Sequence, residues 1–142
     1  MQLLDTKSSL VGIYSAMTLP FTIWILRAYF QNIPVEFEEA ARMDGCGYLR
    51  TLVKVVIPLA RPGIIAAAIF AFMTSYGEFV FATVLTHTLN SKTQTVVIAA
   101  LTQGMSASRG LIAASAVICF LPPIILAILF RNHIVKGLTA KF

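Results

Sequence analysis

The chain has 142 residues, of which 58% are hydrophobic and only 12% are charged. About a quarter of the residues in an ordinary soluble domain are charged, so this composition indicates an integral membrane protein. The net charge of +5 does not indicate nucleic-acid binding, because the basic residues do not gather on one soluble face and bear on membrane topology instead. Two cysteines are too few for a disulfide framework.

Three apolar segments are long enough to cross a bilayer, and we predict spans at about residues 10–30, 63–86 and 110–130. Pro20 in the first span removes a backbone hydrogen bond and predicts a kink. The prolines at 122 and 123 predict a kink in the third span. The N-terminus has neither a basic region nor a small-residue cleavage site, so a removed signal peptide is not expected.

Small residues recur every fourth position at the start of the second predicted span, at Gly63, Ala67, Ala71 and Ser75. Such a stripe lets another helix approach closely within lipid, and it predicts a packed partner helix. Alanine is also simply common in membrane helices, and the residues leave both interpretations open.

Glu78 is the one charged residue inside the second predicted span. In a continuous helix it lies about 22 Å from Gly63, in the outer third of the bilayer. A carboxylate is costly to bury there, which makes Glu78 a candidate residue of a translocation path. The equal alternative is a carboxylate that reaches the interface or is tied to the neighbouring backbone after Gly77.

A charged stretch, residues 32–58, separates the first two predicted spans. Pro34 suits the first position of a helix, and the glutamates that follow favour a helix N-terminus. Glu38 and Arg42 stand four residues apart, in the favourable order for a surface ion pair. Gly45 suits the left-handed position that ends a helix, so we predict a helix, a glycine break and a second, basic amphipathic helix.

The same stretch contains Glu39-Ala40-Ala41, then three residues, Gly45, nine residues and Val55-x-Ile57-Pro58. This spacing resembles the EAA motif, E-A-A-x(3)-G-x(9)-I-x-L-P, of permease subunits of ABC importers, with two hydrophobic positions changed conservatively. In that family the motif forms a cytoplasmic coupling helix that docks on the ATPase subunit. An ordinary amphipathic helix between two spans would explain the charges but not the spacing.

Two further segments resemble the sugar class of this family. The sequence from Val135 to Ala140 resembles the carboxy-terminal V-x-G-L-T-A signature, and Tyr76-Gly77-Glu78-Phe79 resembles a segment that helps to line the path. The implied fold is all-α, with three transmembrane helices plus a cytoplasmic coupling helix, half of a type I importer (MetI-like) transmembrane domain. The family typically has six spans, so we expect a fragment of a longer permease or a truncated gene product.

The basic residues favour one orientation. Five of them flank or occupy the 31–61 loop: Arg27, Arg42, Arg50, Lys54 and Arg61. Three lie in the 131–142 tail: Arg131, Lys136 and Lys141. Only three fall on the other side of the membrane: Lys7, Lys92 and Arg109. The positive-inside rule then places the coupling loop and the C-terminus inside, and the N-terminus and the 87–109 loop outside. We expect a short helix or re-entrant element in this outer loop, facing the extracytoplasmic solute-binding protein.

The resemblance implies a permease subunit of an ATP-driven, binding-protein-dependent importer, for a sugar, in a bacterial or archaeal cell (inner) membrane. Its partners would be ATP-binding subunits, a second permease subunit and a solute-binding protein, with no nucleic acid. Glu39, Ala40, Ala41, Gly45 and Pro58 would couple it to the ATPase. The chain has no G-x-x-x-x-G-K-[ST], H-E-x-x-H or G-x-S-x-G, so no catalytic, cofactor-binding or metal site is expected. Permeases for polyamine, phosphate or peptide, and a non-transporting membrane remnant or scaffold, stay open.

Overall fold

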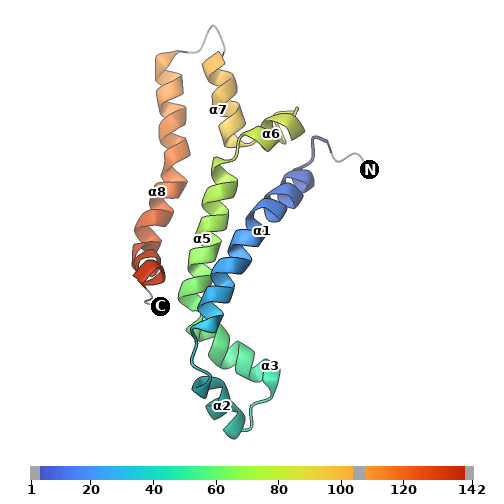
Figure 1. Ribbon diagram of the computed structural model, residues 1–142. Helices are drawn as coiled ribbons and strands as arrows, with labels where there is room; N and C mark the ends of the chain where they lie inside the picture. Colours follow the sequence, from blue (N-terminus) through green and yellow to red (C-terminus); the bar gives the residue numbers. More distant parts are fainter. Residues whose placement is uncertain (1–3, 104–107, 140–142) are drawn as a thin grey trace. The chain divides into compact units, whose positions relative to one another are not determined.

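The computed structural model describes residues 4–103 and 108–139, with side chains at 4–102 and 108–131. These residues form helices and contain no strand (Figure 1): α1 (Lys7–Gln31), α2 (Glu36–Met43), α3 (Tyr48–Thr51), the π-helix η1 (Leu52–Val56), α4 (Ile57–Leu59), α5 (Arg61–Gly77), α6 (Val80–Leu85), α7 (Gln94–Gln103) and α8 (Arg109–Thr139). The chain divides into two compact units. Unit 1 comprises Met1–Leu19 and Phe72–Leu129, and unit 2 comprises Pro20–Ala71 and Phe130–Phe142.

Among the described residues, two helices are long and apolar enough to cross a membrane: Lys7–Gln31 and Arg109–Arg131. Tyr48–Leu59 and Arg61–Gly77, which are bent by 70° relative to each other, are together long and apolar enough to form a third. The first and third predicted spans therefore coincide with long apolar helices, and both helices continue through their prolines. The segment predicted as the second span differs, because it contains two helices, α5 and α6, separated at Glu78 and Phe79.

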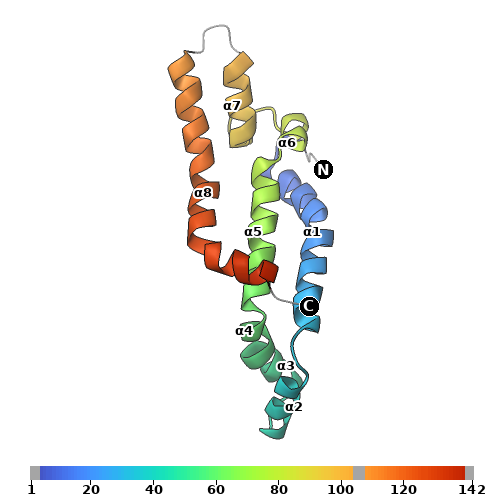
Figure 2. The same cartoon turned by 60° about the vertical axis from the view of Figure 1, so that its left-hand side comes forward.

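In unit 2, the second half of α1 packs against the first half of α5. The rings of Phe21 and Phe70 are 4.1 Å apart between centroids. Gly63 is buried against Tyr29, and a Cβ added at Gly63 would lie 2.2 Å from Cγ of that tyrosine. Ala67 is 2% exposed. The packed partner helix that the small-residue stripe predicted is therefore α1, which both Figures 1 and 2 show beside α5.

Prolines explain the irregular helical run that leads into α5. Pro58 has no N–H to donate to the carbonyl four residues earlier, and the turn before it widens to a π-helix in which Ile57 N–H donates to Leu52 O. Pro62 likewise lacks a donor, and the chain bends at Ala60, between Tyr48–Leu59 and Arg61–Gly77. Figure 2 shows α4 between α3 and α5, at this bend. The proline at the end of the predicted EAA motif thus shapes the helical run in which it lies.

Unit 1 has a small apolar core where α1, α6 and α7 meet. Leu10, Ala82 and Val96 are buried there, with Tyr14 and Leu85 packed against them. The Tyr76 hydroxyl lies 2.8 Å from Gln94 Oε1 and 3.0 Å from the Cys119 carbonyl oxygen.

The contact between Tyr76 and α8 follows from the proline pair in that helix. Pro123 has no N–H to donate to the carbonyl of Cys119, four residues earlier, so this carbonyl lacks its helical partner. The Tyr76 hydroxyl lies within hydrogen-bond distance of that oxygen. A side chain of α5 thereby compensates for a defect that the sequence of α8 creates.

Candidate functional site

The turn between α2 and α3 has the hydrogen bonds of a Schellman motif. Gly45 has a φ of +78°, in the left-handed region, as predicted for a residue that ends a helix. The N–H of Cys46 donates to the carbonyl of Ala41, and the N–H of Gly45 donates to that of Arg42, both at 3.0 Å. The last carbonyls of α2 are therefore satisfied within the chain, and the direction in which the chain leaves α2 is determined by local backbone geometry.

Helix α2 begins slightly later than its proline indicated. Its first residue is Glu36, so Pro34 precedes the helix instead of occupying its first position, and the Pro34 carbonyl accepts from Phe37 N–H at 3.3 Å. Three glutamates lie in the first turn of α2 and Arg42 lies in the last, in keeping with the helix dipole. The predicted ion pair is present, with Arg42 Nη2 3.8 Å from Glu38 Oε2. Both side chains are exposed enough to limit its contribution to about 0.3–0.5 kcal/mol.

The predicted coupling residues differ in exposure. Glu39, Ala40 and Gly45 are exposed, whereas Ala41 is only 6% exposed and Pro58 is half-buried. Ala41 therefore packs inside unit 2, where its carbonyl also accepts the Cys46 N–H. Within the EAA triplet, two residues are accessible to a partner protein and the third supports the turn.

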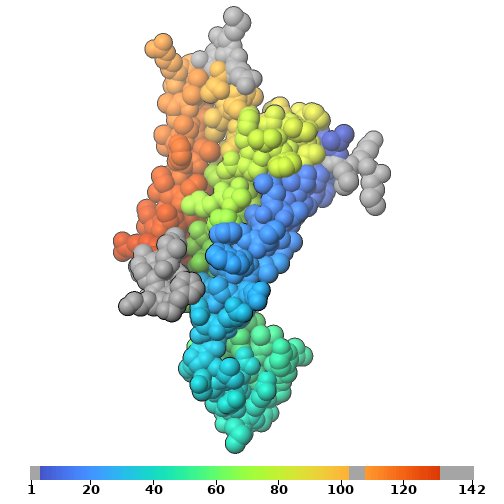
Figure 3. All heavy atoms as spheres, in the orientation of Figure 1, coloured from blue at the N-terminus to red at the C-terminus, as the bar shows by residue number. Residues whose placement is uncertain are grey.

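Large apolar side chains are also exposed on α2, α3 and η1, and the sequence prediction did not single them out. These side chains, called here the apolar coupling patch, are Phe37, Met43, Tyr48, Leu49 and Val53, which are 48%, 88%, 73%, 73% and 61% exposed. Figure 3 shows part of these helices (teal to green), left uncovered on that face by α1 and α5 of the same unit. The available signal was the recurrence of apolar residues among charges on both sides of Gly45. Several large exposed apolar side chains on neighbouring short helices are typical of a protein-binding surface.

Glu78 joins three elements of unit 1. Its Oε1 accepts from Phe81 N–H at 2.9 Å, and its Oε2 accepts from Ala82 N–H at 3.1 Å and from the Tyr14 hydroxyl at 3.0 Å. Its carbonyl accepts from the Thr95 hydroxyl at 2.9 Å. The carboxylate thus caps the N-terminus of α6 and ties it to α1. This arrangement matches the second interpretation of Glu78, a carboxylate bound to the backbone that follows Gly77.

Asp5, which the sequence analysis did not single out, organises the loop between α6 and α7. Its Oδ1 accepts from the Ser91 hydroxyl and from the N–H groups of His87 and Thr88, at 2.8 and 2.9 Å for the two amides. Its own N–H donates to Leu85 O, and its φ is +61°. The Ser91 hydroxyl, followed by the Thr88 and His87 amides, lowers the pKa of the Asp5 carboxyl below its ordinary value. We refer to these contacts as the Asp5 clamp.

No group of three or more histidine, cysteine, aspartate or glutamate side chains that could hold a metal ion occurs among the described residues. Cys46 and Cys119 are free thiols. The features that the structure brings together are therefore exposed apolar side chains on α2, α3 and η1, and a hydrogen-bonded cap and loop in unit 1.

Similarity to known proteins shows the family of the chain. Residues 2–140 match the family described as "Binding-protein-dependent transport system inner membrane component". The chain is 38% identical over 138 residues to the trehalose/maltose transport system permease protein MalG of Thermococcus litoralis, covering 96% of the chain and 49% of that protein.

Other sugar permeases are similarly related. The trehalose transport system permease protein SugB of Mycobacterium tuberculosis is 37% identical (97% of the chain, 51% of the relative). The maltodextrin transport system permease protein MdxG of Bacillus subtilis is 32% identical (96% and 50%). The chain spans about half the length of these relatives. The family is a transport component, in agreement with the prediction that the chain is not an enzyme. With its match over residues 2–140, the chain belongs to the binding-protein-dependent transport system inner membrane components.

Proposed function

We propose that this chain forms part of the permease of an ATP-driven, binding-protein-dependent sugar importer and that α2 and α3 couple it to the ATPase. The proposal for a sugar is supported by the trehalose/maltose, trehalose and maltodextrin permeases among its relatives. The main support for the coupling role is that α2 and α3 are exposed and are joined by a turn whose geometry depends on Gly45. A short, structurally defined helix with an exposed apolar patch is suited to a groove on a partner protein.

In this proposal, the apolar coupling patch contributes buried area to the contact with the ATP-binding subunit, and Glu39 offers its carboxylate to a basic group there. Ala40, with its small exposed side chain, permits close approach. Ala41, Gly45 and Pro58 act within the chain: the first two hold the turn, and Pro58 shapes the run that continues into α5. Closure of the ATPase would then move α2 and α3 together, as one rigid element.

The proposed topology has three crossings, which are α1, the second predicted span at about residues 63–86 with α5, and α8. The coupling helices and the C-terminus lie inside, and the N-terminus and the α6–α7 loop lie outside. The distribution of basic residues supports this orientation. A second permease subunit and a solute-binding protein complete the importer. Glu78 lies near the outer end of the proposed path, where we assign it the role of holding α6 against α1 beside that path.

The coupling role is tested with Gly45→Val in membranes that contain the permease, its ATPase, the second permease subunit and the solute-binding protein. A β-branched residue is strained at a positive φ, so the direction in which the chain leaves α2 should change. We expect sugar transport to fall sharply while ATP hydrolysis continues and membrane insertion stays normal.

Gly47→Ala is the matched control for Gly45→Val, because Gly47 has a φ of −67° and a Cβ there meets nothing within 4 Å. The control should transport normally. If Gly45→Val retains transport, α2 and α3 are not the coupling element. Uptake of labelled maltodextrin, trehalose, polyamine, phosphate and peptide by the wild-type complex tests the sugar assignment separately.

A further inference from the structure

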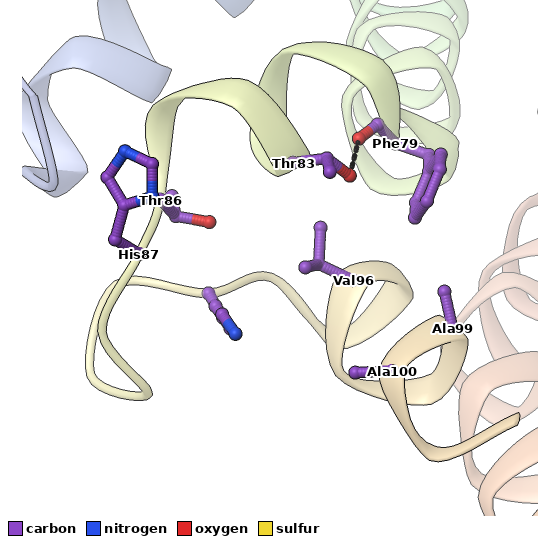
Figure 4. A pocket seen from close by; sticks show the side chains of 8 residues that line it. Phe79, Thr83, Thr86, His87, Val96, Ala99 and Ala100 are labelled. Atoms are coloured by element: carbon purple, nitrogen blue, oxygen red, sulfur yellow. Dashed lines mark hydrogen bonds between the residues drawn. The ribbon is translucent and has the colours of Figure 1, made fainter. Parts of the chain in front are cut away.

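Unit 1 contains a pocket of about 260 Å³ between α6 and α7 (Figure 4). His87 and Lys92 line it from the α6–α7 loop, and its apolar wall consists of Phe79, Val96, Ala99 and Ala100. Figure 4 shows Val96 of α7 directed toward the helix that carries Thr83. The volume is below the roughly 300–1,000 Å³ of sites that enclose a small molecule, so a larger ligand would place only one part of itself in the pocket.

The pocket lies where an apolar part of the chain meets a polar one. Residues 79–85, FVFATVL, contain α6 and carry no charge, and the polar residues 86–95, THTLNSKTQT, follow directly. In a membrane protein, such a change of polarity marks the level of the lipid headgroups. Val80 and Val84, one turn apart on α6, are 66% and 63% exposed, and Leu89 in the loop is 80% exposed. These apolar side chains are suited to contact with lipid.

The hydrogen-bond donors available in the pocket are those of Lys92 and His87. The Thr83 and Thr86 hydroxyls donate to backbone carbonyl oxygens four residues earlier, at 2.7 and 2.6 Å, so their protons are already used. No hydrogen bond or ion pair of the Lys92 ammonium occurs among the residues that the structure describes. An ammonium has three N–H donors and an imidazole has at least one, so the pocket offers its donors to an anion.

The carboxylates of unit 1 leave this attraction in place. Asp5 and Glu78 are its two acidic residues, and no acidic residue follows Glu78 in the sequence. Glu78 caps α6, and Oδ1 of Asp5 accepts the three hydrogen bonds of the Asp5 clamp. Oδ2 of Asp5 is outside the clamp, but no ion pair joins it to Lys92. A half-buried ammonium beside an apolar wall therefore stays available to a bound anion.

The loop that carries Lys92 is held by contacts within the chain. The Asp5 clamp binds His87, Thr88 and Ser91, and the N–H of Lys92 donates to Thr88 O at 3.2 Å. The backbone on both sides of the pocket opening is therefore fixed without a ligand. A preorganised site loses less conformational entropy when a ligand binds.

We propose that this pocket binds an anionic phospholipid of the surrounding membrane. Its phosphate accepts hydrogen bonds from Lys92 and His87, and its acyl chains cover Val80, Val84 and Leu89. A soluble phosphate ester would leave these three apolar side chains exposed. A zwitterionic lipid carries its own cation, which competes with Lys92 for the phosphate. The inference goes beyond the proposed function and requires only that the chain lies in a membrane.

The test uses the protein purified in mild detergent together with the subunits that accompany it. It is mixed with phosphatidylglycerol that carries a diazirine in one acyl chain, and on illumination the diazirine loses nitrogen and labels the groups that it contacts. Chymotrypsin digestion, which does not depend on residue 92, and mass spectrometry then locate the label. We expect labelling within residues 79–100. Unlabelled phosphatidylglycerol should compete for it, whereas phosphatidylcholine and glycerol 3-phosphate should compete at least about tenfold less well.

Three variants test the charge at position 92. Lys92→Glu should lower labelling of residues 79–100 about tenfold, because it places a carboxylate beside the phosphate, whereas Lys92→Arg should keep labelling within about twofold. Lys7→Glu is the matched control, because Lys7 is an exposed basic residue of the same unit that does not line the pocket, and it should leave labelling unchanged. Thermal unfolding of Lys92→Glu in lipid-free detergent should match the wild type, which separates lost lipid binding from misfolding.

Several results would overturn the inference. Equal labelling of residues 79–100 in the wild type and in Lys92→Glu would show that the pocket does not recognise the phosphate. Equal competition by phosphatidylcholine would show contact with lipid without recognition of charge. Equal competition by glycerol 3-phosphate would assign the pocket to a soluble phosphate ester. None of these results bears on the proposed importer function, which the transport assays test separately.

Discussion

Two glycines of unit 2 are required for opposite reasons. Gly45, between α2 and α3, has a positive φ, yet a Cβ added there would meet nothing within 4 Å. Gly63, in α5, has ordinary helical geometry, yet a Cβ there would lie 2.2 Å from Tyr29 Cγ. The first glycine supplies a backbone conformation, and the second supplies space for the neighbouring helix.

The difference between the two glycines shows which structural roles can be predicted from neighbouring residues in the sequence. The role of Gly45 follows from residues within one turn, because a glycine that ends a charged helix has a recognisable context. The role of Gly63 depends on a tyrosine 34 positions earlier, and the small-residue stripe predicted only that some helix packs there. Substitutions can therefore distinguish a requirement for backbone conformation from a requirement for steric space. They can also distinguish contacts within one turn from contacts between residues far apart in sequence.

The largest effect is expected for Gly63→Ala. The new methyl group would collide with the base of the Tyr29 ring, which cannot turn away as the end of a flexible side chain can. Overpacking of this kind costs about 3 kcal/mol of unfolding free energy. Thermal unfolding of the purified protein in detergent measures it. Gly12→Ala in α1, where a Cβ meets nothing within 4 Å, is the control, and equal stability of the two variants would show that α1 and α5 do not pack closely at Gly63.

A smaller loss of stability is expected for substitutions at the junction between α5 and α6. No glycine at this junction has a positive φ, and the Glu78 carboxylate caps α6 instead. Glu78→Ala leaves two α6 amides and the Tyr14 hydroxyl without their acceptor, at a cost of about 2 kcal/mol. Tyr14→Phe removes only one of these hydrogen bonds and should cost about half as much. The unfolding free energies of the two variants test this order, and a Tyr14→Phe loss as large as that of Glu78→Ala would assign the stability to α1 packing instead.

Gly45→Ala tests conformation alone, because there is space for the added methyl group. The left-handed backbone should cost about 1–2 kcal/mol. Gly47→Ala, in an extended conformation with equal space, should be close to neutral. Hydrogen exchange of the Cys46 amide, which donates across the turn, reports the local effect. Equal protection in both variants would show that the turn does not depend on a left-handed residue.

The smallest effect is expected for the Asp5 clamp between pH 8 and pH 5. The clamp lowers the pKa of Asp5 in the folded protein, so its contribution is fully present above the unfolded pKa of about 3.9 and is lost as the pH falls through the folded pKa. Protection of the Thr88 amide against exchange, corrected for intrinsic rates, should stay constant over this range and should be lower throughout in Asp5→Asn. A loss of protection between pH 7 and pH 6 would show that a group other than Asp5 controls the loop.

Much of the structure of the proposed coupling region was predictable because the residues that determine it are close in sequence. The Glu38–Arg42 pair and the left-handed Gly45 were predicted and are present. The start of α2 was misplaced by two residues, since helix ends depend on weak competing hydrogen bonds. The apolar coupling patch was not singled out, because exposure is decided by what the rest of the chain covers. For the same reason the internal position of Ala41 was not foreseen.

The sequence by itself determined the membrane character, the two long apolar helices, the family and the turn after α2, because hydropathy, spacing and backbone preference are local properties. Only the tertiary structure decided the partners of residues far apart: Tyr29 against Gly63, Tyr14 on Glu78, and Asp5 on the loop before Lys92. These contacts join positions 34, 64 and 83 residues apart. Sequence periodicity describes which face of a helix is apolar, but it contains no information about which distant side chain meets that face.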